Sequence, residues 1–517
     1  MSLKESVAAG HKIVHDANLQ DMAELIGCKF SEASAILQRN MATATVTKAK
    51  TLISRQHAIA ILRNDPSFAL GGHLDEAAAI EEELTTFFKA AGTDKDSLEN
   101  DAIAQLSFQD DIFKPLNHVP WMIFLITMFK VWVVPAMTLM TPIMAWILPY
   151  ILLRFVYALP IGQQEYAQIL QGLWAGNMPQ PGAEAPDLLT PRSIAQFIVF
   201  GFSFAQSMIQ PIQNAMHLNK TDTIITGLGN QLIRLRNIVR SLRPYADNLS
   251  VKLADVLEEL DETDARRAFL LVKEEPERLH MIFRDLANLE ILWRLATGTV
   301  PLTFVTFKPD VLFLDNAVDI SLKTAVPSTL ELTETGRRHA IITGPNGGGK
   351  SSFLRAVLQS VVLGHSYGVA PALHAIMPRF IWIASGLQLR DTPGLYSMFE
   401  TEVKFAADCI QSSRSAGPGP GLVLFDELFH STNPPDGIRS AELFLKQLWA
   451  PEAHVYSIVS THVFPLVESA PATVDAICCP ASERLDGTIH YNYKVEHGIS
   501  RVSSVRTVWE KYGLHLR

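Results

Sequence analysis

The spacing of apolar residues changes along this chain, and each change predicts a different kind of structure. Over residues 21–89 and again over 221–297, apolar residues recur at intervals of three and four, which predicts consecutive amphipathic helices. From residue 301 onward, short β-branched runs such as HAIIT, RFIWIA, GLVLFDE and HVYSIVST alternate with helical segments. That alternation is typical of a mostly parallel α/β sheet, so we expect an α-helical amino-terminal region and an α/β carboxy-terminal domain.

An unusually apolar block separates the two helical regions. Between residues 117 and 162 the only formal charges are Lys130 and Arg154. Cut near residues 137–142, the block gives two stretches of about twenty residues, each long enough to cross a hydrocarbon core of ~30 Å. We therefore expect a two-span membrane hairpin over residues 118–161. The other interpretation is a soluble apolar hairpin buried in an oligomer, and the two charges favour it because a charge is costly in lipid.

Two weaker segments follow the apolar block. Residues 163–193 are rich in Gly, Pro, Gln and Ala, which predicts an exposed connection. Residues 194–212 are apolar but contain Ser, Gln and Pro. We interpret them as an interfacial or core helix and not as a membrane span.

Length and charge narrow these expectations. At 517 residues the chain exceeds what one hydrophobic core usually organises, so two or more packed units are expected. The net charge of -9 argues against a surface coated in positive potential, and nucleic-acid contact would need a local patch. Four arginines on one predicted helix are either solvated helix surface or a patch that meets phosphates or anionic lipid headgroups: Arg234, Arg236, Arg240 and Arg243.

Cysteine usage and the amino terminus bear on location. The four cysteines are too few and too irregularly spaced for a disulfide framework, and no Cys/His spacing suits a zinc site. The first thirty residues lack the continuous apolar core of a secretory signal. We therefore expect an intracellular, reducing compartment.

A glycine-rich loop provides the strongest chemical signal. The apolar strand 340–343 runs into a loop with phosphate-binding spacing, and a helix follows from Ser352. Glycines let backbone amides turn inward around phosphate oxygens, and Lys350 would reach the β- and γ-phosphates of ATP while the Ser351 hydroxyl ligates Mg²⁺. The predicted ATP-binding residues are Gly344, Pro345, Asn346, Gly347, Gly348, Gly349, Lys350, Ser351 and Ser352.

Two later strands end in residues suited to ATP hydrolysis. Strand 421–425 ends in Asp426 and Glu427, which predicts Asp426 as holder of the magnesium-bound water and Glu427 as general base. Strand 455–460 is followed by His462, predicted to sense the γ-phosphate. The plainer interpretations are a solvated acidic strand end and a structural hydrogen-bonding histidine. The glycine-rich loop upstream favours the catalytic assignment of Glu427, His462 and Lys350.

These motifs resemble the ATPase domain of the MutS family. The resemblance rests on Ile342-TGPNGGGKSSFLR, Leu422-VLFDELFHSTNPPDG and Ser460-THVFPL, and it extends to Tyr493-KVEHGISRVSSV and, upstream, to Thr51-LISRQHAIAILRND. It implies a P-loop, ABC-like fold and a homodimer. In that dimer the signature segment, with Ser397 and Glu402, would approach the nucleotide of the other subunit, beside the D-loop-like residues Thr432 and Asn433.

The sequence also departs from the family pattern. Gly347 and Glu400 replace two methionines, and Phe429-His430-Ser431 replaces Gly-Arg-Gly. The chain enters the helical core almost at once, which indicates a short MutS-like branch without the mismatch-recognition domain. We expect a helical core over 1–115, an apolar block and linker over 116–215, a second helical core over 216–300, and the ATPase domain over 301–517.

Two functions follow from the resemblance, and a third is weaker. The first is a dimeric ATPase that couples ATP binding and hydrolysis to DNA binding in mismatch repair or recombination, tethered to a membrane through 118–161. Its ATPase domain would face the cytosol or nucleoplasm. The alternative is a membrane-anchored mechanochemical ATPase that does not act on DNA. A non-hydrolysing ATP binder is the third, and Glu427 argues against it.

Overall fold

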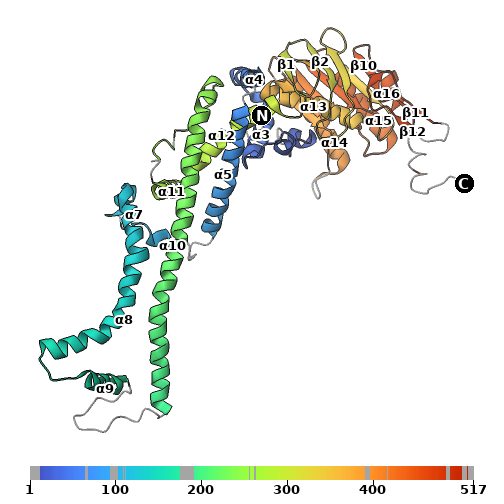
Figure 1. Cartoon of the computed structure of the whole chain (residues 1–517). Helices are drawn as coiled ribbons and strands as arrows, with labels where there is room; N and C mark the ends of the chain where they lie inside the picture. The colour runs from blue at the N-terminus through green and yellow to red at the C-terminus, as the bar shows by residue number, and fades with distance from the viewer. Residues whose placement is uncertain are drawn as a thin grey trace. The chain divides into compact units, whose positions relative to one another are not determined.

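The computed structural model describes residues 12–64, 68–93, 103–108, 110, 112–174, 191–255, 257–260, 264–390, 396–415, 417–484, 489–503 and 509 (Figure 1). The chain divides into two compact units, each described by itself. Unit 1 consists of Met1–Ala78, Leu242–Ala254 and Met281–Arg517, and unit 2 of Ala79–Ser241 and Asp255–His280. The first segment of the chain therefore belongs to the same unit as the α/β region. The four-part division expected from the sequence stays a prediction.

A six-stranded sheet forms the centre of unit 1. Its strand order is β13-β10-β4-β9-β8-β7, and every pairing is parallel except that of the edge strand β13. The strands are β4 (His339–Thr343), β7 (Trp382–Gly386), β8 (Gly421–Phe425), β9 (Val455–Ser460), β10 (Val474–Cys478) and β13 (Glu496–His497). Strands β4, β8 and β9 are buried at every position, as a parallel sheet covered on both faces requires. The predicted parallel α/β sheet is confirmed.

A second sheet and a short hairpin complete the β-structure described in unit 1. The second sheet has the order β3-β2-β6-β1-β5 and mixes parallel and antiparallel pairs, and β11 pairs with β12. The strands are β1 (Thr303–Phe307), β2 (Val311–Ala317), β3 (Ser328–Thr333), β5 (Val369–Ala370), β6 (His374–Met377), β11 (Ala481–Glu483) and β12 (Ile489–Tyr491).

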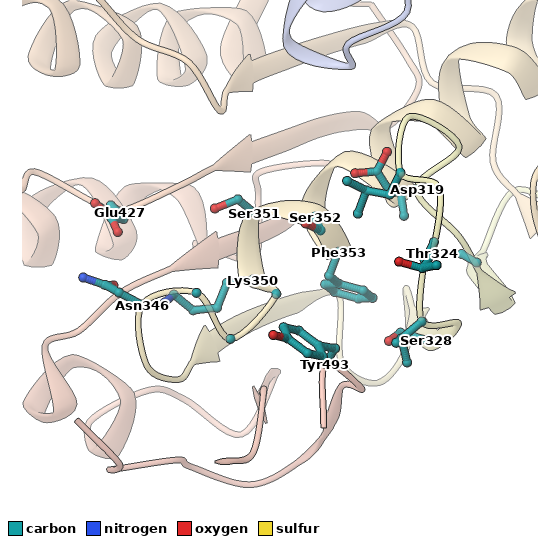
Figure 2. Close-up of a pocket in the computed structure, with 18 residues that line it drawn as sticks. Asp319, Thr324, Ser328, Asn346, Lys350, Ser351, Ser352, Phe353, Glu427 and Tyr493 are labelled. Carbon is teal, nitrogen blue, oxygen red and sulfur yellow. The ribbon is translucent and has the colours of Figure 1, made fainter. Parts of the chain in front are cut away.

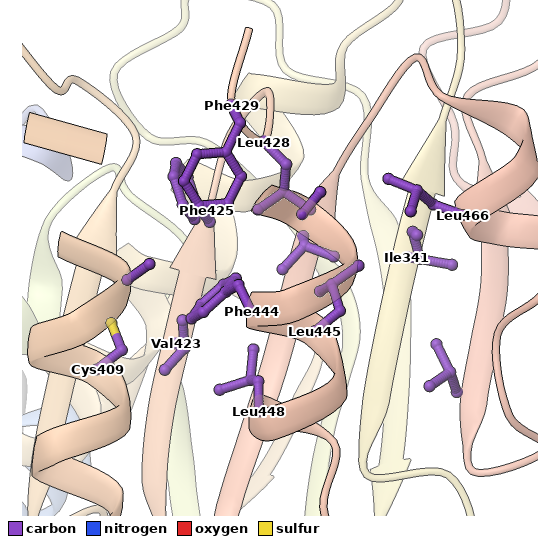
Figure 3. Close-up of a cluster of buried hydrophobic side chains, with 14 of the residues drawn as sticks. Ile341, Cys409, Val423, Phe425, Leu428, Phe429, Phe444, Leu445, Leu448 and Leu466 are labelled. Atoms are coloured by element: carbon purple, nitrogen blue, oxygen red, sulfur yellow. The ribbon is translucent and has the colours of Figure 1, made fainter. Parts of the chain in front are cut away.

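Three helices of unit 1 cover one apolar region of the six-stranded sheet (Figure 3). They are α14 (Met398–Ser415), α15 (Pro434–Leu448) and α16 (Phe464–Glu468). Phe425 at the end of β8 makes edge contacts with Phe405, Phe429 and Phe444, with ring centroids 5.1 to 6.0 Å apart. Aromatic edge contacts of this kind add to the free energy gained by burial. The core therefore fixes the carboxyl end of β8, where the acid pair follows.

The helix α13 (Lys350–Tyr367) joins the amino-terminal helices to the two sheets. The amino-terminal helices are α2 (Met22–Leu25), α3 (Ala33–Ala42), η1 (Ala44–Val46), α4 (Ala49–Asn64) and the start of α5 (Phe68–Thr93). Near the carboxyl end of α13, Arg55 donates to the Ser366 carbonyl at 2.7 Å and Asn40 to the Tyr367 hydroxyl at 2.8 Å. These bonds tie the amino-terminal helices to the helix that begins at the glycine-rich loop.

The regular secondary structure described in unit 2 is helical. It contains η2 (Lys114–His118), α7 (Pro120–Met128), the π-helical turns η3 (Phe129–Val133) and η4 (Leu152–Val156), α8 (Val134–Ile151), α9 (Gln163–Trp174) and α11 (Ala265–Glu274). Helices α5, α10 (Pro191–Asn248) and α12 (Glu277–Thr297) contribute residues to both units. Phe269 is fully buried and packs against Phe87 and Phe88, with ring centroids 5.8 and 6.1 Å apart.

The apolar block differs from the predicted two-span hairpin. Helix α8 continues through residues 137–142, and Figure 1 shows that the run bends there instead of reversing. A proline such as Pro142 bends a helix without ending it when the flanking turns keep their bonds. Among the described residues, Trp121–Thr141 is the one stretch long and apolar enough to cross a membrane, and 17% of its apolar window is buried. The apolar stretch Ile147–Val156 is shorter.

The arginine-rich part of α10 is held by contacts within unit 2. Arg236 is buried and donates to the Leu260 carbonyl, and Arg240 pairs with Glu258 at 3.0 Å. Arg236 and Arg240 therefore have protein partners, which argues against an open phosphate-binding patch at these two positions.

Two buried histidines predict how stability depends on pH. Burial lowers the pKa of His339 to about 3 and that of His365 to about 4. His365 Nε2 accepts from the Phe380 amide and Nδ1 lies 2.9 Å from the Val361 carbonyl, an arrangement that fits the neutral ring. Both native pKa values lie below the unfolded value of ~6.5, so the contributed stability is complete above that pH and is lost as pH falls.

We expect each histidine to cost about 2 kcal/mol of folding free energy at pH 5 relative to pH 7. Thermal unfolding of the parent and of His365→Gln across this range measures the effect. Glutamine does not titrate, so the variant should lose less stability on acidification. Equal losses in the two proteins would contradict the assignment to His365.

Candidate nucleotide site

The glycine-rich loop lies between β4 and α13, at the carboxyl edge of the six-stranded sheet (Figure 2). Gly344, Gly347 and Gly349 have φ values of 149°, 78° and 102°, in the region that favours glycine. A Cβ at Gly344 would also lie 2.8 Å from the Cys479 carbonyl oxygen. The loop conformation thus depends on glycine at these positions, and it exposes the amino terminus of an eighteen-residue helix.

Lys350 is folded back against the loop that precedes it. Its Nζ donates to the carbonyls of Gly344 at 2.9 Å and Pro345 at 3.1 Å, and the residue is 5% exposed. Burial lowers the pKa of Lys350, while the carboxylates of Asp426 and Glu427 act in the opposite direction. A cation held this way stabilises the loop and can transfer its hydrogen bonds to an anion that enters it.

Two hydroxyls hold the Asp426 carboxylate from different elements. Ser351 at the start of α13 donates to Oδ2 and Ser460 at the end of β9 donates to Oδ1, both at 2.5 Å. The Ser460 oxygen also accepts from the Glu427 amide at 2.7 Å. The structure therefore brings together the predicted metal-binding residues Ser351 and Asp426. It adds Ser460. The sequence signal for this residue is a polar side chain at the end of the buried strand β9, which pairs with β8.

Glu427 and His462, which follow the neighbouring strands β8 and β9, lie next to each other. His462 Nε2 is 3.5 Å from Glu427 Oε1, and both side chains are partly exposed. The hydrogen bond from His462 lowers the pKa of Glu427, nearby positive charges act in the same direction, and burial opposes them. Glu427 has a φ of 52°, an unusual backbone conformation for a side chain this large.

This pair predicts a pH effect. Replacing His462 with alanine removes the main cause of the lowered pKa, so Glu427 should become protonated at a higher pH than in the parent. If Glu427 is a base, the acidic limb of the pH profile of kcat/KM for ATP moves to higher pH. The control is His454→Ala, since His454 lies beside Glu334 and is not among the groups that shift the pKa of Glu427. Overlapping acidic limbs for His462→Ala and the parent would contradict the role.

A cavity of about 470 Å³ adjoins the loop. Its polar end contains Lys350, Ser351 and Glu427. Figure 2 shows Phe353 and Tyr493 at its other end, together with Asp319, Thr324 and Ser328. Phe353 directly follows the predicted loop, in α13. Tyr493 and the lining residues from 317 to 328 come from segments distant in the sequence, and no local pattern indicates that they pack against the loop.

One wall of the cavity is braced by Asp319. This buried carboxylate accepts from Gln359 and Arg355 of α13, each at 2.9 Å. Its bonds hold the segment after β2 against the helix that begins at the glycine-rich loop. We assign Asp319 a positioning role.

The predicted signature residues Ser397 and Glu402 have different environments. Ser397 is exposed at the start of α14. Its amide donates to the Glu400 carboxylate at 2.8 Å, and the Glu400 amide donates to the Ser397 hydroxyl at 3.2 Å. This reciprocal capping box stabilises the first turn of the helix and accounts for glutamate at position 400.

Glu402 is a correction to the predicted cross-subunit set. Its side chain is fully buried in its own subunit, where it accepts from Ser431 at 2.5 Å and lies 3.0 Å from His430 Nδ1. Phe429 is also buried, in the core of Figure 3. The residues Phe429-His430-Ser431 thus have partners within the chain, and Glu402 holds the loop after the acid pair. Because the Glu402 side chain has no exposed surface, it cannot contact another subunit in this conformation.

The D-loop-like residues lie at the start of α15. Asn433 caps this helix by accepting from the Asp436 amide at 3.1 Å, and Thr432 precedes it, partly exposed. The cap alone explains asparagine here. A contact of Thr432 and Asn433 with another subunit stays a prediction.

Comparison with known proteins gives the same family as the motifs. Residues 340–514 match the family model described as MutS domain V. The chain is 32% identical over 188 residues to the mitochondrial DNA mismatch repair protein MSH1 of Arabidopsis thaliana, covering 36% of this chain and 16% of that protein. It is 28% identical over 262 residues to the DNA mismatch repair protein MutS of Leuconostoc mesenteroides, covering 47% and 28%. For the DNA mismatch repair protein MutS of Natronomonas pharaonis the identity is 26% over 273 residues, covering 50% and 31%. The matches therefore span less than a third of each relative.

Proposed function

We propose that this chain is a MutS-family ATPase that uses the cavity beside the glycine-rich loop. The match of residues 340–514 to MutS domain V supports the proposal. The observation that carries the proposal is the Ser351–Asp426–Ser460 cluster next to Lys350 and Glu427. A hydroxyl, a carboxylate, an ammonium group and a second carboxylate at the start of one helix are the groups that ATP hydrolysis requires.

The polar end of the cavity suits a triphosphate and Mg²⁺. The amides of residues 344–352 and Lys350 would bind phosphate oxygens, and Lys350 would exchange its carbonyl partners for them. Ser351 and Asp426 are oxygen donors of the kind that Mg²⁺ prefers, and their oxygens already face each other. Bound Mg²⁺ supplies charge neutralisation for the phosphates.

Glu427 would act as the general base. Its lowered pKa keeps the carboxylate ionised at neutral pH, ready to accept a proton from water as that water attacks the γ-phosphorus. His462 would position Glu427 and stabilise its charge. The aromatic rings of Phe353 and Tyr493 (Figure 2) suit a flat aromatic base, so the nucleotide would lie with its phosphates toward Lys350.

We further propose that a homodimer couples ATP binding to DNA engagement, with Ser397 meeting the nucleotide of the partner. The relatives are DNA mismatch repair proteins, which favours this coupling. The second candidate is a membrane-anchored ATPase that does not act on DNA. It is favoured by the exposed apolar helix Trp121–Thr141 and by the protein partners of Arg236 and Arg240. In either case the ATPase domain faces an intracellular compartment that contains ATP.

The test uses the Glu427→Gln variant, which should hold ATP without hydrolysing it. Binding to homoduplex, mismatched and branched DNA is measured with and without ATP across a salt series. If the chain contacts DNA phosphates, ATP-dependent affinity falls steeply as salt rises. Binding to vesicles without any DNA affinity would replace DNA coupling by the membrane function.

A further inference from the structure

Unit 2 exposes two long apolar helical surfaces. The first lies on η3, α8 and η4, and the second on the amino-terminal part of α10. The exposed large side chains on the first surface are 39 to 71% exposed, and those on the second are 48 to 71% exposed. Examples are Trp132, Met137 and Phe155 on the first, and Ile198, Phe202, Ile209 and Met216 on the second. An apolar area of this size on a folded chain requires a cover.

The two runs lie opposite each other at one level and have opposite chain directions. A cavity of about 380 Å³ is lined by Thr127, Val131 and Trp132 from one run and by Asn219 and Asp222 from α10. Residues near 131 therefore lie opposite residues near 220. Figure 1 shows the first part of α8 beside α10, whereas the part of α8 after its bend turns away from α10.

The charge-free stretches of the two runs begin at the same level. In the first, no charged residue occurs between Lys130 and Arg154, and in the second none occurs between Arg192 and Lys220. As helices, residues 131–153 measure ~34 Å and residues 193–219 measure ~40 Å along the chain. The α10 stretch exceeds the ~30 Å of a hydrocarbon core, whereas the bend in α8 (Figure 1) makes residues 131–153 shorter from end to end than along the chain.

A polar layer marks where both stretches start. Asp222 forms two bonds with Arg266, at 2.6 and 2.7 Å, and Lys130 donates to the Gln105 carbonyl. Lys220 is in the same layer by its position in α10. With Lys130 at the boundary, the charge no longer falls in the middle of a membrane segment, as it does in the stretch Trp121–Thr141.

We propose that residues 193–219 of α10 form the second membrane-inserted helix of this protein, paired antiparallel with residues 131–153. The bilayer hydrocarbon covers both exposed surfaces, and the layer of Lys130, Lys220 and the Asp222–Arg266 pair lies at the headgroups. The inference rests on the membrane association proposed above and not on ATP hydrolysis. By composition alone residues 194–212 are not apolar enough for a membrane span. The inference therefore rests on their exposed apolar side chains and on their place beside the first run.

The test is flotation of the full-length protein with neutral phosphatidylcholine vesicles, where attraction of cationic side chains to anionic lipid plays no part. Phe202→Lys and Met137→Lys should each lower the vesicle partition coefficient by at least ~10-fold, because a lysine in the hydrocarbon is costly. Asn230→Lys is the matched control, since it adds the same charge to an exposed position of α10 beyond Lys220. Brominated lipid should also quench the fluorescence that Phe202→Trp adds.

Each outcome decides the proposal. Loss of flotation in Met137→Lys with full flotation in Phe202→Lys would limit insertion to the first run and overturn the assignment of α10. A parent that does not float but forms oligomers in buffer would mean that a second copy covers both surfaces. ATP turnover, measured on the same variants, separates these results from a failure of the ATPase assignment.

Discussion

Replacing Glu427 with glutamine is expected to lower kcat for ATP hydrolysis at least ~100-fold while ATP affinity stays within about threefold of the parent. Glutamine keeps the size of the side chain and can still bond to His462, 3.5 Å away, but its amide cannot take a proton from water. The parent carboxylate is held ionised by that histidine and by nearby positive charge. Turnover and equilibrium ATP binding, measured on the same preparation, separate chemistry from binding.

The matched control for this variant is Glu442→Gln. Glu442 is exposed on α15 and lies outside the cavity lining, so its replacement should leave turnover unchanged. If Glu427→Gln hydrolysed ATP at the parental rate, Glu427 would not be the base. Water activation would then need another group in the cavity.

Replacing Lys350 with alanine is expected to weaken ATP binding by ~10- to 150-fold, because a charge-assisted hydrogen bond to phosphate contributes about 1.5–3 kcal/mol. The change also removes the bonds from Nζ to the carbonyls of Gly344 and Pro345. Part of the loss could therefore come from a less ordered loop. Lys350→Met, which keeps most of the side-chain volume, should bind ATP as weakly as the alanine variant if the charge is what matters.

Titration calorimetry with ATP and Mg²⁺ measures both variants, with Lys446→Ala as control. Lys446 is exposed on α15, so its loss removes one positive charge without touching the site. Retained ATP affinity in Lys350→Ala would show that the loop after β4 is not the phosphate-binding element. Loss of affinity in the alanine variant alone would attribute the effect to packing.

The fold of unit 1 could be predicted where its signals are local. Strands β4, β8 and β9 are short β-branched runs, and their burial on both faces makes such runs continuous in the sequence. The apolar block had no local signal that distinguishes a continuous helix through residues 137–142 from a chain reversal there, because both are compatible with the same composition. In the structure these residues are helical.

The sequence alone indicated the glycine-rich loop, the acid pair that follows β8 and the resemblance to MutS domain V. The loop and the acid pair are each formed by consecutive residues, and the positive φ values of Gly344 and Gly349 favour glycine at these positions. Only the tertiary structure decided the partners of these groups. Ser460 bonds to an acid 34 positions away, Glu402 is buried against Ser431, and Tyr493 reaches the cavity of residues 344–352. Such contacts depend on how segments distant in the sequence pack together. The residue spacing within one segment does not indicate which other segment packs against it.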